Sequence, residues 1–217
     1  RLLRTHKRTD LFRLIAARGW PYLLISLRHT LFSGPSYFPR KWGQFSRGRA
    51  GENPVSCLSV VKDASLSRLD FFIREGGGLL SDHSLECCIY APASDEEAQY
   101  IFARRMESSA LTLGERRRFQ GNVLTFLGKE YAARDIAMQL HIGALRNNSS
   151  RMLKAVGPDT GFDSTDDFLY AGELSALLNS MDSTGELPKT ILYCLNQRDY
   201  EMLAAMCGGH ALFTISD

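Results

Sequence analysis

The sequence predicts an α/β fold with parallel strands, and the prediction depends on three apolar runs separated by helical patterns. The runs span 79–82, 136–142 and 189–195, and polar residues follow each of them. A continuous apolar run between helices is typical of a parallel strand buried on both faces. Parallel strands need crossovers, which the intervening helical segments supply. We therefore expect about three clear parallel strands with crossover helices.

Three helices are predicted before the second run: one precedes the first run, and two lie between the first and second runs. Apolar residues at helical spacing indicate a helix over 58–74, which Gly76, Gly77 and Gly78 end. Ser94 begins a second helix, because three acidic residues follow it in the first turn. Thr112 begins a third, because Glu115 stands three residues later as in a capping box.

Shorter elements are predicted after the central strand. A short helical piece covers 151–156, one helix spans 168–181 and another spans 199–206. Four polar residues before the helix at 168–181 are interpreted first as its caps: Asp163, Ser164, Asp166 and Asp167. Calcium binding is the weaker interpretation, because the EF-hand glycine and final glutamate are missing.

Composition places this chain among soluble globular proteins of one domain. It has 217 residues, of which 44% are hydrophobic, and no apolar stretch approaches the roughly 20 residues that cross a bilayer. The N-terminus has no signal-peptide organisation, so a cytoplasmic location with no membrane partner is expected. The five cysteines show no paired spacing, and we expect them to be reduced.

The charge distribution divides the chain at about residue 50. Residues 1–50 contain eleven Lys or Arg and one acid, whereas 51–217 contain fifteen basic and twenty-three acidic residues. A basic segment with several aromatic residues is also found in proteins that bind nucleic acids or membrane surfaces. We therefore treat 1–50 as a basic segment of doubtful order and 51–217 as the α/β domain.

The most reactive set of side chains follows the central run, in the sequence QLHIGALRNN at 139–148. His141 lies near the end of the run, and Arg146, Asn147 and Asn148 follow after a glycine. In parallel α/β folds the carboxyl ends of strands form the active face. Arg146 there would offer a planar fork of donors to a carboxylate. The simpler interpretation is a structural histidine followed by a capped loop.

Asp82 and His83 end the first run. Neighbouring residues of a strand point to opposite faces, so only one of the two is expected to face a site. An N-cap or a salt bridge within a loop is the alternative interpretation for Asp82.

Four motifs give the region from about 55 to 208 a family resemblance. HIGALRNN, SDHSLE at 81–86, GPDTGFDS at 157–164 and LPKTILYCLNQRD at 187–199 closely resemble the bacterial uronate isomerases, also called glucuronate isomerases. The resemblance implies that 51–217 is part of a (β/α)8 TIM barrel of the amidohydrolase type. It also implies isomerisation of D-glucuronate to D-fructuronate and of D-galacturonate to D-tagaturonate, here as an incomplete part of the enzyme.

The resemblance also implies roles for the residues above. His141, Asp82 and Arg146 become the catalytic candidates, and Arg146, Asn147, Asn148 and His83 become the substrate-binding candidates. A small hexuronate is the expected partner, and a homo-oligomer is compatible with the complete enzyme. The complete enzyme is expected to use a divalent metal such as zinc, but this chain has no His-x-His motif, so its metal ligands remain unassigned.

Two other function classes stay open. One is a metal-dependent hydrolase, since amidohydrolase relatives share the barrel. The other is a noncatalytic module whose basic segment binds nucleic acid, which a reading-frame explanation of that segment disfavours.

The basic segment has a further explanation in the genetic code. Residues 35–39 read Pro-Ser-Tyr-Phe-Pro. At about this place the uronate isomerases carry a strand-end motif that resembles Leu-Pro-Thr-Phe-Arg-Pro. Codons for the first sequence, read one base later, can encode Leu-Pro-Thr-Phe-Arg. We hypothesise that roughly the first 50 residues are translated out of frame.

Overall fold

A parallel β-sheet is the centre of the fold. The computed structural model describes residues 25–26, 57–85, 90–107, 109–158, 160–210 and 213–214. Within these ranges, five strands form the sheet in this spatial order: β1 (Ile25–Ser26), β2 (Leu80–Leu85), β3 (Ala137–Ile142), β6 (Thr190–Cys194) and β7 (Phe213–Thr214). Every neighbouring pair is parallel. The three expected strands are thus confirmed, and β1 and β7 add two short strands at the edges.

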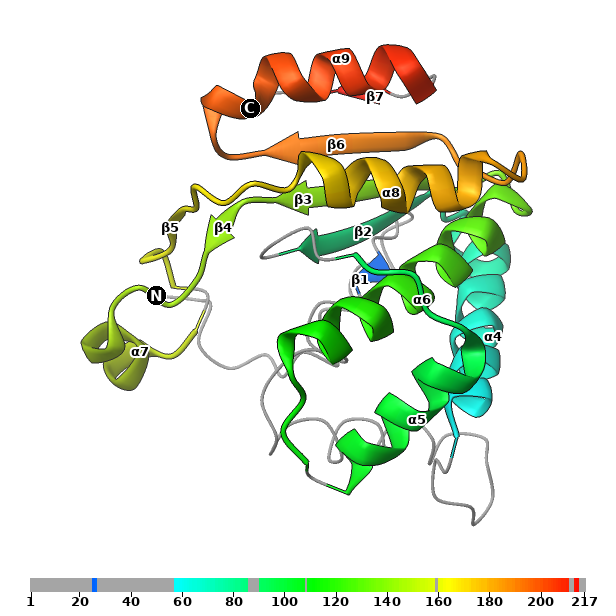
Figure 1. Cartoon of the computed structure of the whole chain (residues 1–217), viewed down its shortest axis with the longest axis horizontal. Helices are drawn as coiled ribbons and strands as arrows, with labels where there is room; N and C mark the ends of the chain where they lie inside the picture. The colour runs from blue at the N-terminus through cyan, green and yellow to red at the C-terminus, as the bar shows by residue number, and fades with distance from the viewer. Residues whose placement is uncertain are drawn as a thin grey trace.

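The sheet is wound in one direction. Strand order follows chain order, so each crossover moves one place the same way across the sheet. The crossovers contain α4 (Leu58–Gly76), α5 (Asp95–Met106), α6 (Leu113–Ala132), α8 (Ala171–Asp182) and α9 (Tyr200–His210) (Figure 1). Doubly wound sheets reverse their order at a switch point, whereas the strands of a β/α barrel follow one another without reversal. The described strands follow one another across the sheet without reversal.

One face of the sheet carries the hydrophobic core. Side chains alternate along β3, so Met138, Leu140 and Ile142 are buried beneath the helices. Helix α6 contacts both β3 and α8. At the contact with α8, a Cβ on Gly128 would lie 2.1 Å from the Met181 sulfur, so this helix pair can approach closely only because Gly128 has no side chain.

Local sequence signals begin α5 and α6 and end α4 as predicted. Ser94 with Glu97 forms a capping box at the start of α5, and Thr112 with Glu115 forms one at the start of α6. Gly77 ends α4 in the left-handed conformation, with φ of 61°. Its backbone N–H and that of the next residue return to carbonyls of the last helical turn.

A small lobe leaves the sheet after β3. It contains β4 (Ala144–Leu145), α7 (Ser150–Val156) and β5 (Ser164–Thr165), and β4 pairs antiparallel with β5. Figure 1 shows α7 set apart from the other helices, beyond the carboxyl end of β3. We call β4, α7, β5 and their connections the strand-end lobe.

The prediction that the polar residues at 163–167 cap α8 is wrong. Helix α8 begins at Ala171, and its N-cap is Tyr170, which makes no side-chain capping hydrogen bond. The polar residues at 163–167 lie farther upstream and contact the strand-end lobe and the loop after β6 instead. A cap must precede the first helical turn directly, and the non-helical residues 168–170 separate these residues from Ala171.

Three cysteines of the described residues are free thiols: Cys57, Cys194 and Cys207. Burial raises the pKa of the Cys194 and Cys207 thiols. Cys87 and Cys88 lie outside the described residues. Within the part of the chain that the structure describes, no helix combines the length and the apolar character needed to cross a membrane.

Candidate active site

The open face of the sheet gathers polar side chains from three neighbouring strands. Partners in a parallel ladder point the same way, and the register pairs Asp82 with Gln139. It also aligns Ser84 with His141 and His141 with Tyr193. These five residues therefore share the face opposite the hydrophobic core, toward the carboxyl ends of β2, β3 and β6.

Asp82 and His141 form the central pair of this face. His141 Nε2 lies 3.0 Å from Asp82 Oδ1, and the two side chains are 44% and 24% exposed, respectively. The Tyr193 ring stacks flat on the imidazole, with centroids 4.3 Å apart and planes 3° from parallel. The pair is thus fixed in orientation while it remains open to solvent.

A hydrogen-bond chain holds Tyr193 in turn. Its hydroxyl donates to Gln139 Oε1 at 2.8 Å, and Gln139 Nε2 donates to the Ser81 carbonyl at 3.2 Å. Gln139 is buried, so both halves of its amide need these partners. Imidazole, phenol and amide consequently form one connected polar layer on the open face.

Arg146 reaches this layer from the strand-end lobe. The chain turns at Gly143, where φ is 93° and favours glycine, and Arg146 follows directly after β4. Its Nη2 donates to Ser84 Oγ at 3.0 Å, and its Nη1 donates to Asp163 Oδ2 at 2.7 Å. The second Asp163 oxygen accepts from the backbone N–H of Asn147 at 2.9 Å. Asp163 therefore holds the guanidinium and the following backbone together.

The structure corrects the expectation that His83 lies with the substrate-binding residues. It is 3% exposed on the helix-covered face, where its Nε2 lies 3.1 Å from the Tyr131 hydroxyl. Burial lowers the pKa of His83 to about 4, which outweighs the opposing effect of the nearby Asp82 charge. A neutral imidazole on that side of the sheet cannot reach a ligand bound beside His141.

Asn147 and Asn148 are exposed and act within their own loop. Asn147 adopts a left-handed conformation with φ of 57°, which asparagine tolerates better than most residues. The side-chain amide of Asn148 donates to the Leu145 carbonyl at 3.2 Å. These contacts match the capped-loop interpretation of this dipeptide and keep Arg146 at the end of β4.

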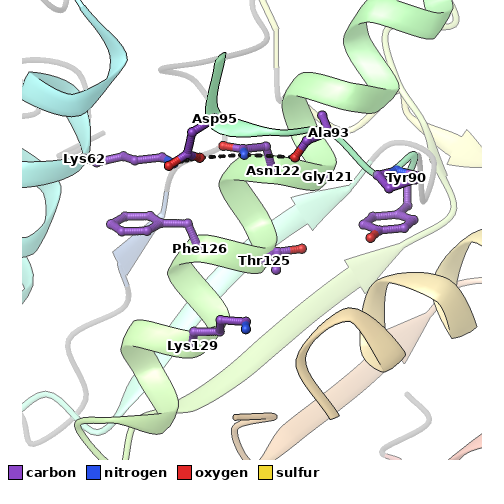
Figure 2. A pocket seen from close by; sticks show the side chains of 10 residues that line it. Lys62, Tyr90, Ala93, Asp95, Gly121, Asn122, Thr125, Phe126 and Lys129 are labelled. Atoms are coloured by element: carbon purple, nitrogen blue, oxygen red, sulfur yellow. Dashed lines mark hydrogen bonds and ion pairs between the residues drawn. The ribbon is translucent and has the colours of Figure 1, made fainter. Parts of the chain in front are cut away.

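A hollow of about 230 Å³ lies on the other side of the sheet, in the helical layer. Figure 2 shows that its lining comes largely from α6 and from the segment around Tyr90 and Ala93. Its charged groups are engaged with protein partners: Lys62 pairs with Asp95 at 2.7 Å, and Lys129 pairs with Glu186 at 2.5 Å. We assign no ligand to this hollow, and the Asp82–His141 pair remains the candidate site.

Sequence reasoning missed three members of the site. Ser84 lies two residues from Asp82 on β2, and Tyr193 lies on β6, but the strand register that brings both to His141 is not visible in one sequence. The sequence predicts Asp163 as a helix cap, and the β4–β5 pairing brings it to Arg146 instead.

Fold and site together define a parallel α/β protein that gathers an acid, a histidine and an arginine at the carboxyl edge of its sheet. Residues 48–215 match the sequence model of a family described as glucuronate isomerase. This match covers more than half of the chain. The chain belongs to the glucuronate isomerase family.

Individual relatives agree with this assignment. A uronate isomerase of Salmonella heidelberg is 50% identical over 160 residues, covering 73% of this chain and 34% of the relative. One from Actinobacillus succinogenes is 45% identical over 161 residues, covering 74% and 34%. The chain thus spans about a third of the length of these relatives.

Solved structures support the fold. A uronate isomerase from Thermotoga maritima has a TM-score of 0.74 and 26% identity, covering 82% of this chain and 38% of that chain. A glucuronate isomerase from Caulobacter crescentus has a TM-score of 0.78 and 24% identity, covering 97% and 44%.

Proposed function

We propose that this chain carries part of the active site of a uronate isomerase. The reaction is conversion of D-glucuronate to D-fructuronate and of D-galacturonate to D-tagaturonate. The observation that carries the proposal is the open Asp82–His141 pair, stacked on Tyr193, with the Arg146 guanidinium on the adjacent Ser84. Family membership directs the choice of a hexuronate as substrate.

The fold that accompanies this proposal is a portion of an amidohydrolase-type (β/α)8 barrel. Five parallel strands in chain order, with α6 against the covered face, support it. In such a barrel the open face of the described sheet would face the barrel axis, and the carboxyl ends of its strands would line the active face.

The chemistry requires a proton to move between two neighbouring carbons. A base removes the C2 proton while the C1 carbonyl oxygen gains one, which gives a cis-enediol. The C2 hydroxyl then loses its proton as C1 gains one, and the aldose becomes a ketose. One acid/base group beside C1 and C2 can serve both steps, provided that it is held within hydrogen-bond reach.

His141 is the proposed proton-transfer group. Imidazole changes charge near neutral pH, and an adjacent carboxylate orients it and stabilises its protonated form. Asp82 occupies this orienting position at 3.0 Å. Tyr193 limits rotation of the imidazole by stacking on its plane.

Arg146 is the proposed anchor for the sugar carboxylate. It projects to Ser84, on the same face as His141, so a carboxylate bound there would place the other end of the sugar toward the imidazole. Asp163 already neutralises part of its charge. A bound uronate would therefore share the guanidinium with Asp163.

A metal is not part of the proposed steps. Among the described residues, no group of three or more His, Cys, Asp and Glu side chains is arranged to hold a metal ion. Asp82 and His141 are too few to form a zinc site by themselves. We therefore derive no step through a metal.

The test is isomerisation of D-glucuronate and D-galacturonate by this chain and by a version extended to the length of the relatives, each with and without zinc. Activity of the extended version is expected, and Arg146→Ala should weaken uronate binding by about 10- to 100-fold, the loss of one charge-assisted contact. Lys189→Ala is the matched control, because Lys189 forms an exposed ion pair with Asp135 at the other end of β6. Inactivity of both versions, or unchanged binding in Arg146→Ala, would contradict the proposal.

A further inference from the structure

The strand-end lobe has little packing of its own to fix its position. No residue of α7 is buried, and β4 and β5 have two residues each. A segment with few buried contacts is held mainly by its polar contacts with neighbouring elements. The position of Arg146, which follows β4, therefore depends on what holds the lobe.

The loop after β6 supplies such contacts. The Asn196 side chain donates from Nδ2 to the Asp166 carbonyl at 3.2 Å and to Asp167 Oδ1 at 3.3 Å. Its Oδ1 accepts from the backbone N–H of Arg198 at 3.1 Å, which fixes the amide orientation. The Arg198 guanidinium forms an ion pair with Asp167 as well. We call Asn196, Arg198 and Asp167 the clasp.

Arg198 also forms an ion pair with its neighbour Asp199. Its Nε donates to Asp199 Oδ1 at 3.1 Å, and the Asp199 side chain is only 11% exposed at the end of the short 3-10 helix η1 (Gln197–Asp199), directly before α9. Asp199 N–H in turn donates to the Asn196 carbonyl at 3.0 Å. The β6 side of the clasp is thus held together within the turn that joins β6 to α9, and Asp167 lies two residues after β5 of the lobe.

The clasp is next to β5, the strand that Asp163 directly precedes. Asp166 N–H donates to the Gly143 carbonyl at 2.8 Å, and the β4–β5 register aligns Leu145 with Ser164. Asp163 precedes Ser164 and binds both Arg146 and the backbone of Asn147. A displacement at Asp167 would therefore be transmitted over four residues to the partner of Arg146.

We propose that Asn196 and Arg198 are positioning residues of the candidate site. Through Asp167 they hold the returning strand of the lobe, so that Asp163 keeps the Arg146 guanidinium beside Ser84 and His141. The inference rests on the proposed function for the identity of the ligand, a hexuronate carboxylate. The placement of Arg146 is a property of the chain without ligand and is tested separately.

Asp167→Ala is the most informative variant. Asp167 is 76% exposed and Arg198 is 44% exposed, and exposed ion pairs contribute little to stability. The variant leaves the Arg198–Asp199 pair intact, whereas Arg198→Ala would leave the mostly buried Asp199 carboxylate without that partner. Asp167→Ala should consequently keep the melting temperature of the wild type while it loosens the lobe.

The first measurement follows the Nε–H NMR signal of Arg146 in the 217-residue chain, assigned by its loss in Arg146→Lys. We expect Asp167→Ala to shift this signal and lower its heteronuclear NOE, and Asp167→Asn, which keeps an oxygen for the Asn196 amide, to restore part of both. Lys189→Ala should change neither. An Arg146 signal unaffected by Asp167→Ala would overturn the inference.

The second measurement is kinetic, in whichever version of the protein isomerises D-glucuronate. Asp167→Ala should raise KM on the order of fivefold with a smaller change in kcat, and it should add nothing in an Arg146→Ala background, because coupled residues are not additive. An equal effect in both backgrounds would overturn the inference. If no version isomerises D-glucuronate, the proposed function fails, while the NMR comparison still decides whether the clasp positions Arg146.

Discussion

His83 and His141 lie on adjacent strands but have opposite environments. His83 faces the helices and is 3% exposed, whereas the His141 side chain is 44% exposed on the open face beside Asp82. The difference follows from strand alternation, which turns Asp82 and His83 to opposite faces of β2. The same residue type therefore serves as a core group on one strand and as a proton-transfer candidate on the next.

The buried His83 predicts a loss of stability in mild acid. Its pKa is about 4 in the folded chain and about 6.5 when exposed, so between these values the unfolded chain binds a proton that the folded chain excludes. The free energy of unfolding should fall as the pH decreases through this window, by up to about 3 kcal/mol from this residue.

Urea unfolding of the wild type and His83→Gln between pH 7.5 and 4.5 checks this prediction. Carboxyl groups with lowered pKa values, such as that of Asp95 beside Lys62 and Asn122, also lose stabilising contacts in acid. The informative quantity is therefore the wild-type minus variant difference at each pH. The prediction would be wrong if this difference stayed constant across the window.

Helix α6 shows how one element fixes several others. One side of it buries Tyr131 against His83, and Gly128 admits Met181 of α8. Another side of α6 contacts the segment before α5. The Ala91 N–H donates to the Arg117 carbonyl at 3.3 Å, and the Asn122 side chain donates to the Ala93 carbonyl at 3.3 Å. Figure 2 shows this segment running alongside α6 at Gly121.

Two glycines of α6 should respond oppositely to replacement by alanine. A Cβ on Gly121 would lie 2.5 Å from the Ala91 carbonyl oxygen, so Gly121→Ala must displace backbone and should destabilise the chain by about 1 to 3 kcal/mol. A Cβ on Gly114 would meet nothing nearer than 3.9 Å, so Gly114→Ala should stabilise the helix by up to about 1 kcal/mol.

Thermal and urea unfolding of the two variants measure this contrast on one helix. Equal effects would contradict the assigned close approach at Gly121.

At the scale of the whole chain, the family match and the charge division fall at nearly the same place. The match begins at residue 48, and residues 1–50 hold eleven of the 26 basic residues with a single acid. Within this segment the structure describes only the backbone of Ile25–Ser26, which pairs with β2. We propose that the segment is translated out of frame, as the codons of 35–39 suggest.

Resequencing the source DNA tests this proposal. We expect one inserted or missing base between the codons of about residues 39 and 50. Correction of the frame should replace Pro-Ser-Tyr-Phe-Pro at 35–39 with Leu-Pro-Thr-Phe-Arg. An uninterrupted frame through this stretch would refute the proposal.

Local signals in the sequence determined the main elements and part of the site. Capping boxes, Gly77 and the apolar runs specify helix ends and strands through contacts within a few residues, so α4, α5, α6, β2, β3 and β6 could be predicted. The motifs around His141, Asp82 and Arg146 also gave the family. These features depend on residues that are close together along the chain, so a single sequence is enough to predict them.

Tertiary structure decided which side chains meet. Strand register places Ser84 and Tyr193 beside His141, and strand alternation places His83 in the core. The β4–β5 pairing places Asp163 beside Arg146 and not at the start of a helix. The clasp at Asn196 and Arg198 likewise joins residues about 30 positions apart. Such contacts arise from packing free energy summed over distant segments, and no local pattern encodes them.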